Sequence, residues 1–224
     1  ENFGKTYFSF MYNGDRFLVL DAETDGSNIS GEQFSWFHEM ITSTPNGANI
    51  FIFTHRPIWA EDDEVLGAAF PDNTKSITGT NFDEVFGKLS SMENHNIYWF
   101  SGSLGNAPAS FFYHQVDGLK IHYIQTAIRD LPRDAMLSVQ IKDRKVSFET
   151  VSLTGQELEP LEHYNLELWL EDRPVQEFNT RLIPLYIKLM LTHRYFWYGV
   201  LSLTMCIVTL MFLRKWRRKR KLRA

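Results

Sequence analysis

The chain has 224 residues, 44% of them hydrophobic and 15% aromatic, which is enough for one globular domain with a core and an appendage. Its formal charge of −4 is unevenly distributed. The last eleven residues, 214–224, carry eight Lys or Arg and no acid, so residues 1–213 sum to about −12. The single cysteine, Cys206, excludes a domain held together by intrachain disulfides.

The first residues predict a β-hairpin. Two β-rich runs, Lys5–Tyr12 and Arg16–Asp21, are joined by Asn13-Gly14, a pair that favours a tight turn because both residues tolerate a positive φ. The second run contains "FLVL", which is apolar on both faces and is typical of a central strand.

A helix and a second buried strand follow the hairpin. In "NISGEQFSWFHEMI", Ser30 is the expected N-cap and Gln33 stands three residues later, the spacing of a capping box, before apolar residues on one helical face. Asn49–Thr54 has the composition of a buried strand and ends directly before His55. We expect residues 59–78 to form a long loop that contains four consecutive acids.

The alternation continues and then changes character. A second helix is expected to begin at Thr80–Asp83, and a short strand is expected at Asn96–Phe100. Four alternating strands are expected next, at Ser110–Gln115, Leu119–Ala127, Met136–Asp143 and Lys145–Leu153. Strands that alternate with helices and then give way to an antiparallel meander predict an α/β layered domain over residues 1–153, with a β-sheet core and flanking helices.

The C-terminal part predicts a membrane anchor. Residues 154–194 are expected to form an acidic connector and an amphipathic juxtamembrane segment. Tyr195–Leu213 is a run of 19 residues without a charge, close to the roughly 20 that a helix needs to cross a bilayer. A buried core helix is the alternative, but the basic block 214–224 that follows has no place in a core.

The charge distribution predicts the orientation of this anchor. By the positive-inside rule, the tail 214–224 lies in the cytoplasm and the main domain lies on the extracytoplasmic side, as in a single-pass membrane protein. The lipid bilayer is then a partner of both the helix and the basic tail. A basic run can also bind nucleic acid, but a position directly after an apolar span argues against that partner.

Five segments, taken in order, resemble one known family. They are "TYFSFMYNGDRFLVLDAE", "ISGEQFSWFHEMI", "NIFIFTHRPIW", "NIYWFSGSLGN" and "DGLKIHYIQTA". Over residues 3–153 their order and spacing are similar to the C-terminal half of the calcineurin-like metallophosphoesterases, including the purple-acid-phosphatase-like branch. The resemblance implies hydrolysis of phosphate mono- or diesters at a centre of two metal ions (Fe, Zn or Mn), bound mostly by residues that would precede this chain.

His55 is the main candidate site residue. It ends a strand at the edge where ligands bind in open α/β sheets, so it could bind a metal, move a proton or form a structural hydrogen bond. In the family that the chain resembles, a strand ending in hydrophobic–Thr/Ser–His–x–Pro supplies one metal ligand, and the resemblance carries this role over to His55. Arg56 is expected to contact the substrate phosphate or to pair with the acidic loop.

One family motif is replaced in this chain. The family usually has Ser-Gly-His-x-His after the strand expected here at Asn96–Phe100, whereas Ser103 and Gly105 stand at the two histidine positions and neither can replace an imidazole. Asn106 could offer an amide oxygen to the substrate. The family's Asp-x-His, Gly-Asp-x-x-Asp and Gly-Asn-His-Glu/Asp motifs have no match here, as expected for the C-terminal part of a longer chain. No catalytic residue is assigned.

Two functions are therefore open. The first is a membrane-anchored metallophosphoesterase, favoured by the retained His55-Arg56-Pro57 element. The second is a catalytically degraded phosphoesterase fold kept as a scaffold or binding module of the cell envelope, favoured by the loss of the histidine pair. Asp21 and Glu23 are expected near the site, Asp21 as a capping group rather than a ligand. His114 and His122 are expected to face each other across a hairpin, more as a structural pair than as a metal site.

Overall fold

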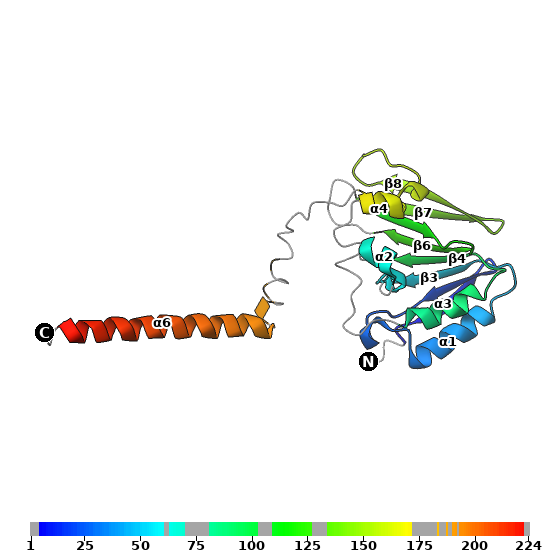
Figure 1. Cartoon of the computed structure of the whole chain (residues 1–224). Coiled ribbons are helices and arrows are strands. Elements are labelled where there is room, and N and C mark those ends of the chain that lie inside the picture. The colour runs from blue at the N-terminus through cyan, green and yellow to red at the C-terminus, as the bar shows by residue number, and fades with distance from the viewer. Residues whose placement is uncertain are drawn as a thin grey trace. The chain divides into compact units, whose positions relative to one another are not determined.

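The computed structural model describes residues 5–60, 63–69, 81–102, 109–126 and 134–171, and then 183, 187, 190, 191 and 193–221. The chain divides into two compact units, Glu1–Val175 and Gln176–Ala224, each of which is described by itself. The first unit is an α/β structure with a mixed six-stranded sheet, a separate two-stranded sheet and flanking helices (Figure 1).

The N-terminal hairpin is confirmed. Strand β1 (Phe8–Tyr12) pairs antiparallel with β2 (Asp15–Val19), so that Tyr12 lies opposite Asp15. Asn13 and Gly14 form the turn with φ values of 50° and 84°, the left-handed conformation that these two residue types tolerate best. The first strand lies at one edge of the sheet, and the second leads into its interior.

Four parallel strands form the centre of the large sheet. Its order is β1-β2-β3-β4-β6-β5, with β3 at Ile50–Thr54, β4 at Ile97–Ser101, β5 at Phe111–Gln115 and β6 at Ile121–Thr126. Strands β2, β3, β4 and β6 are parallel, whereas β1 and β5 run antiparallel at the two edges. The expected antiparallel meander is confirmed only in part: its first two and its last two strands form antiparallel hairpins, but β6 pairs in parallel with β4 rather than with the strand that follows it.

The register of β5 and β6 also corrects the expected histidine pair. His114 lies opposite Tyr123, and His122 lies opposite Gln115. Because side chains alternate between the faces of a sheet, this one-residue offset places the two imidazoles on opposite faces. Instead, Nδ1 of His122 forms a hydrogen bond with the Tyr113 hydroxyl at 2.9 Å.

Helices cover one face of the large sheet. Helix α1 (Gly31–Thr42) and helix α3 (Phe82–Ser90) lie side by side on this face (Figure 1). Their inner apolar residues pack with alternate residues of the parallel strands in one buried cluster, which includes Phe37, Val85 and Trp99. The apolar periodicity of both helices therefore predicted the faces that they bury.

Two local expectations are wrong in this region. The expected loop 59–78 contains a short helix, α2 (Glu64–Ala69). The capping box is not formed, because Gln33 makes two tertiary hydrogen bonds instead: its Oε1 accepts from the Asp21 backbone N–H at 2.7 Å, and its Nε2 donates to the Asp21 carbonyl at 3.0 Å. Ser30 stands at the N-cap position, but its hydroxyl bonds Asp25 rather than the helix.

The other face of the sheet is covered only in part. The hairpin of β7 (Ala135–Lys142) and β8 (Lys145–Ser152) forms the two-stranded sheet and contributes apolar residues to a second buried cluster. Helix α4 (Leu166–Glu171) packs at the β5 edge of the sheet, where its buried Trp169 joins the cluster of the helical face and donates from Nε1 to the Phe111 carbonyl at 2.9 Å. The residues from 154 to the end of α4 therefore belong to the same compact unit as the sheet, beyond the domain end expected at residue 153.

An aromatic row crosses this second face. Phe10, Phe17, Phe51 and Tyr98 occupy successive paired positions on β1, β2, β3 and β4. Their rings are stacked, with centroids 4.9, 4.7 and 5.2 Å apart along the row, and Tyr98 stacks in turn on His122 at 4.8 Å. Stacked rings on neighbouring strands stabilise the pairing beyond the area that they bury.

One corner of the same face is exposed. Phe8 on β1 is 53% exposed and Phe53 on β3 is 36% exposed, although both point to the face that carries the aromatic row. Val139 of β7 is also partly exposed, although it stands between two inward-facing residues of its strand. We call Phe8, Phe10 and Phe53 the aromatic corner. It lies toward the carboxyl ends of the parallel strands.

The two phenylalanines of β3 allow a matched test of this packing. Phe51 is 1% exposed and Phe53 is 36% exposed, and the two side chains share a face two residues apart. We expect Phe51→Ala to lower the free energy of unfolding by about 3–5 kcal/mol and Phe53→Ala by less than about half of that, because only Phe51 leaves a closed cavity. Urea unfolding of the full chain in detergent, followed by tryptophan fluorescence, measures both. Equal losses would contradict the closed packing around Phe51.

The second unit contains a long helix. Helix α6 spans Arg194–Lys221, and its part from Arg194 to Phe212 is long and apolar enough to cross a membrane by length and composition, with a mean hydropathy of 1.7. The span expected at Tyr195–Leu213 lies within this helix. The basic residues of the tail follow the apolar part and continue the helix to Lys221.

Two charges introduced into the apolar part of α6 test whether this helix anchors the chain in a membrane. Arginine at the centre of a spanning helix costs about 2.5–3.5 kcal/mol. We therefore expect Leu203→Arg combined with Val208→Arg to shift the chain from the membrane pellet into the supernatant during alkaline carbonate extraction. Met136→Arg, at an exposed position on β7, is the control and should stay in the pellet with the unaltered chain.

Candidate functional site

The ends of three parallel strands meet at one edge of the sheet. Beyond the paired residues, the Leu20 N–H donates to the Phe53 carbonyl at 2.9 Å, and the Gly102 N–H donates to the His55 carbonyl at 3.0 Å. These hydrogen bonds continue the pairing of β2 with β3, and of β3 with β4, one residue beyond the ends of the strands. They place the residues that follow β2, β3 and β4 next to one another, at the edge where ligands bind in open α/β sheets.

A buried hydrogen-bond network holds the turn that leaves β3. The Thr54 hydroxyl donates to the Arg56 carbonyl at 2.8 Å and accepts from Trp99 Nε1 at 2.8 Å. The Ser101 hydroxyl lies 3.0 Å from Thr54 Oγ1 and accepts from Trp59 Nε1 at 3.1 Å. Because the Thr54 proton is already used, Ser101 must donate to Thr54. Every donor in the network is thereby satisfied, and we call these four side chains the Thr54 network.

His55 projects from this turn toward solvent. Its side chain is 63% exposed, and its Nε2 lies 4.0 Å from Oε1 of Glu23, which follows β2. This separation is too long for a hydrogen bond. Two ligands at about 2.1 Å from one tetrahedral metal ion lie roughly 3.4 Å apart, so a small side-chain rotation would bring both atoms into one coordination sphere. The sequence placed Glu23 near the site but gave it no role.

Gly102 lies against the other side of the imidazole. A Cβ atom added at Gly102 would stand 3.5 Å from His55 Nδ1 and 3.5 Å from its carbonyl oxygen. This is ordinary contact, so a larger side chain at this position would lie along the ring. Of the two ring nitrogens, Nε2 faces Glu23, while Nδ1 faces the β4 exit.

Arg56 is held by a strained turn. Its Nη1 donates to the Ser27 hydroxyl, and Ser27 is itself buried. Asp25, Gly26 and Ser27 all have positive φ values, at 50°, 64° and 74°. A run of left-handed residues that includes Asp and Ser costs free energy and is tolerated where the surroundings enforce it. The structure therefore positions the Arg56 guanidinium beside the β2 exit.

Asp21 acts as a capping group, as expected. Its Oδ1 accepts from the backbone N–H groups of Glu23 and Thr24 at 2.9 and 3.2 Å, and its Oδ2 accepts from the Thr24 hydroxyl at 3.0 Å. Burial acts to raise the pKa of this carboxyl, but hydrogen bonds from Thr6, Glu23 and Thr24 outweigh burial and hold the pKa below its usual value. The carboxylate is ionised at neutral pH, and it fixes the backbone that carries Glu23.

Gln125 is a buried residue of the site that the sequence did not indicate. It is 0% exposed on β6, opposite Ser101, and its Nε2 donates to the Gly102 carbonyl at 2.6 Å. Its Oε1 has no hydrogen-bond partner among the described residues. The amide therefore fixes the β4 exit and leaves one buried acceptor directed at the same end of the strands, a costly arrangement unless a donor is supplied.

The remaining site positions predicted from the sequence lie in the segment after β4. Asn106, and the replaced histidine positions Ser103 and Gly105, lie outside the described residues. Asp63, the first described acid of the following loop, accepts from the backbone N–H groups of Val65 and Leu66 and so caps α2. Within the described parts of the chain, no group of three or more His, Cys, Asp or Glu residues lies close enough to hold a metal ion.

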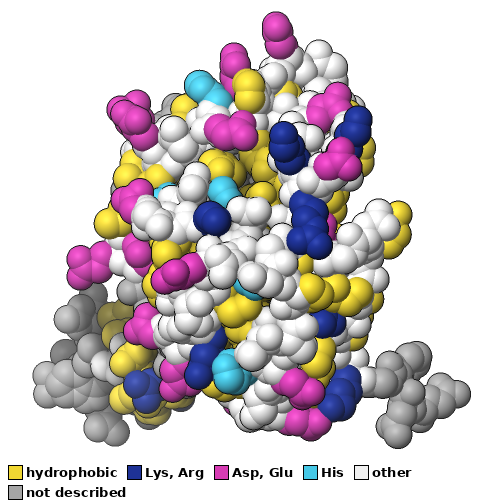
Figure 2. Space-filling model, turned by 90° about the vertical axis from the view of Figure 1, so that its right-hand side faces the viewer, with side chains coloured by type: hydrophobic (Ala, Val, Ile, Leu, Met, Phe, Trp, Pro, Cys, Tyr) yellow, Lys and Arg dark blue, Asp and Glu magenta, His cyan; other side chains and the backbone are white. Residues whose placement is uncertain are grey.

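The charges on another face of the domain are mixed. Figure 2 shows the side that faces right in Figure 1, where acidic and basic side chains are interspersed with hydrophobic ones. This face therefore carries no continuous field of one sign that could steer a charged macromolecule toward it.

Similarity to known proteins does not identify this site. No family model, no curated protein and no solved structure matches this chain. The resemblance to the metallophosphoesterases therefore stays an expectation from the sequence.

The capping role of Asp21 predicts a pH-dependent stability. We expect Asp21→Ala to lower the free energy of unfolding at pH 7 by roughly 1 kcal/mol, since three hydrogen bonds to the carboxylate are lost. Because the folded-state pKa is lowered, this stabilisation is present above the unfolded pKa of about 3.9 and is lost as the pH falls through the folded value.

The measurement is urea unfolding of both chains between pH 7 and pH 3, in which their difference should shrink with falling pH. Glu93→Ala, at an exposed loop position, is the control and should stay within about 0.5 kcal/mol throughout. A difference for Asp21→Ala that is independent of pH would show that the carboxylate charge has no part in the cap.

Proposed function

We propose that this chain is the C-terminal part of a membrane-anchored, metal-dependent phosphoesterase that hydrolyses phosphate mono- or diesters. The observation that carries the proposal is the pairing of His55 Nε2 with Glu23 Oε1 at 4.0 Å, at the carboxyl edge of a parallel sheet. An imidazole and a carboxylate are ligands that suit Zn, Fe and Mn. In this position, they would supply two ligands to a centre of two ions.

The surroundings of the pair suit this role. The Thr54 network fixes the turn that carries His55, and the Asp21 cap fixes the backbone that carries Glu23. Rigid support of this kind is what a metal or catalytic site needs, because a ligand that is free to rotate binds weakly. When bound, a pair of metal ions supplies Lewis-acid stabilisation of the charge that develops on a phosphate ester.

Arg56 has a supporting role in the proposal. Its guanidinium donates to Ser27, which lies beside the β2 exit and in the same segment of the chain as Glu23. A planar guanidinium is well suited to two phosphate oxygens at once. We assign it to the substrate phosphate, with Asn106 as a second substrate contact from the loop after β4.

The other metal ligands are proposed to come from polypeptide outside residues 1–224. The aromatic corner supports this, because Phe53 stands two residues before His55 and leaves an apolar surface exposed at the same end of the strands. A packed segment over that surface would bring further side chains to the edge at which His55 stands. In the full protein, the tail 214–224 is proposed to be cytoplasmic and the domain extracytoplasmic.

A second candidate is an anchored scaffold without catalytic activity. It is favoured by the absence of a third potential ligand near His55 and Glu23 among the described residues. In that case His55 is an exposed surface residue, and the site loses no function when it is removed.

The test is a comparison of the full-length protein with its His55→Ala and Glu23→Gln variants. We expect bound metal and hydrolysis of p-nitrophenyl phosphate or bis(p-nitrophenyl) phosphate. Hydrolysis should fall at least about 100-fold in His55→Ala and about 10–100-fold in Glu23→Gln, because each loses a group that holds the ion. Metal content is measured by mass spectrometry beside the rates. His38→Ala, at an exposed position on α1, is the matched control and should match the unaltered protein.

The scaffold predicts the opposite result. A full-length protein that holds no metal, hydrolyses neither ester and has the same stability with and without His55 would overturn the phosphoesterase proposal.

A further inference from the structure

The outer edge of β5 is only partly covered. This strand lies at the end of the large sheet, and the segment of residues 161–171 runs beside it. The Tyr113 N–H donates to the Tyr164 carbonyl at 2.9 Å, and the Phe111 carbonyl accepts from Trp169 Nε1 at 2.9 Å. These two bonds use the first half of the edge.

The second half of the edge has no partner strand among the described residues. In an antiparallel pair, the N–H and C=O of one residue point to the same side, and the direction alternates along the strand. Because the Tyr113 N–H points away from β6, the Tyr113 carbonyl and both backbone groups of Gln115 point outward too. They have no hydrogen-bond partner among the described residues. An open edge of this kind can pair with an added strand.

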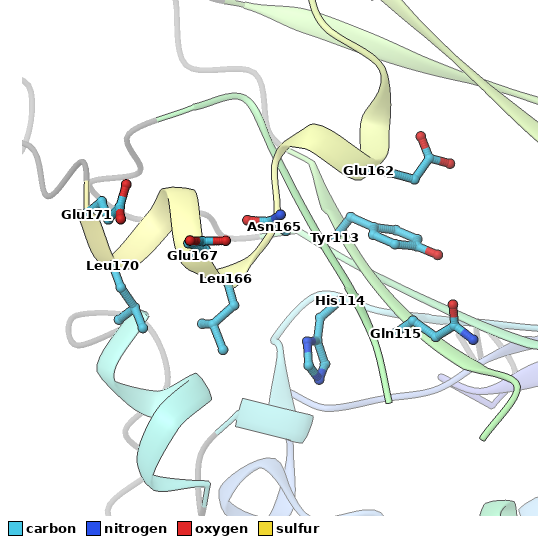
Figure 3. Close-up of a pocket in the computed structure, with 9 residues that line it drawn as sticks. All are labelled: Tyr113, His114, Gln115, Glu162, Asn165, Leu166, Glu167, Leu170 and Glu171. Carbon is cyan, nitrogen blue, oxygen red and sulfur yellow. The ribbon is translucent and has the colours of Figure 1, made fainter. Parts of the chain in front are cut away.

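A pocket of about 640 Å³ opens at this edge, between β5 and α4 (Figure 3). Figure 3 shows Leu166 and Leu170 extending to the same side as His114, whereas the Glu162 carboxyl lies on the Tyr113 side. The nine lining residues include three acids and no Lys or Arg; they are Tyr113, His114, Gln115, Glu162, Asn165, Leu166, Glu167, Leu170 and Glu171.

The charge of the pocket is negative at neutral pH. Burial lowers the pKa of His114, against the opposing influence of Asp117 and Asp63, so the imidazole is neutral. Burial raises the pKa of Tyr113, with a further contribution from Glu162, so the phenol is neutral as well. The acids are therefore not balanced by a cation within the pocket lining.

We propose that the open half of the β5 edge, together with this pocket, binds an extended basic segment of a partner protein. The partner backbone pairs with Tyr113 and Gln115 as an added strand. Its Lys or Arg side chains reach Glu162 on the Tyr113 side of the edge and Glu167 on α4, where their aliphatic stems lie on Leu166 and Leu170. This binding is independent of the metal site, which lies at the strand ends.

Other occupants fit the same observations less well. A small cation would satisfy the acids but would leave the outward backbone groups of β5 unpaired. A second copy of this chain, paired edge to edge through β5, would bring one set of acids against the other, and like charges placed together oppose association.

The test uses the full chain in non-ionic detergent and a fluorescein-labelled peptide with the repeat Lys-Lys-Thr-Thr, which places lysines on both faces of an extended strand. We expect saturable binding by fluorescence anisotropy that weakens with added salt, since part of the attraction is between exposed charges. Glu162→Gln combined with Glu167→Gln should weaken binding at least about 10-fold. Gln115→Pro should weaken it similarly, because it removes an outward N–H while β6 loses no hydrogen bond.

The controls separate this binding from general charge attraction. Glu149→Gln removes an exposed acid of β8 outside the pocket and should leave the affinity unchanged. A peptide that alternates glutamate and threonine should not bind. Circular dichroism and the thermal midpoint check that each variant is folded. The proposal is overturned if the lysine peptide does not bind, or if it binds the double glutamate variant as tightly as the unaltered chain.

Discussion

The parallel placement of β3 between β2 and β4 is the constraint on which the rest of the domain depends. It brings three chain exits to one edge, and the Thr54 network then fixes the direction of the turn that follows β3. Two indole N–H groups and two hydroxyls form this network in the core, where an unpaired polar group would cost about 1–3 kcal/mol. The positions of His55, Arg56 and Trp59 all follow from it.

The two faces of the sheet serve different purposes. The helical face is closed, and its cluster runs continuously from α1 to the parallel strands. The other face combines a stacked aromatic row, a small hairpin and an exposed corner. The closed face forms the larger buried cluster, whereas the other face leaves apolar side chains exposed beside the strand ends. The candidate site lies at the strand ends, next to the exposed corner.

Features with a local cause could be predicted from the sequence. The Asn13-Gly14 turn, the buried run before His55 and the apolar faces of α1 and α3 follow from residue type and spacing. The parallel insertion of β6 was missed because it depends on pairing with β4, more than 20 residues away in the chain. The capping box failed because a tertiary partner, the Asp21 backbone, competed successfully for the Gln33 amide.

The same division applies to the site. His55 could be placed at a strand end because the preceding hydrophobic run defines that end. Its neighbour Glu23 could not be assigned, since the contact depends on a loop that includes three left-handed residues and an Asp21 cap. Gln125 has no sequence signal, because a single glutamine in an apolar strand gains its meaning only from the carbonyl opposite. Asn106 lies outside the described residues.

The aromatic corner has a consequence for handling and for the order of folding. Phe8 and Phe10 lie on an edge strand with alternating large apolar residues, "FSFMY", and such an edge is a template for pairing with another chain. Pairing through this edge is therefore the expected route of self-association when the chain is concentrated. During synthesis β1 emerges from the ribosome before β2, so its apolar residues stay exposed until the hairpin forms.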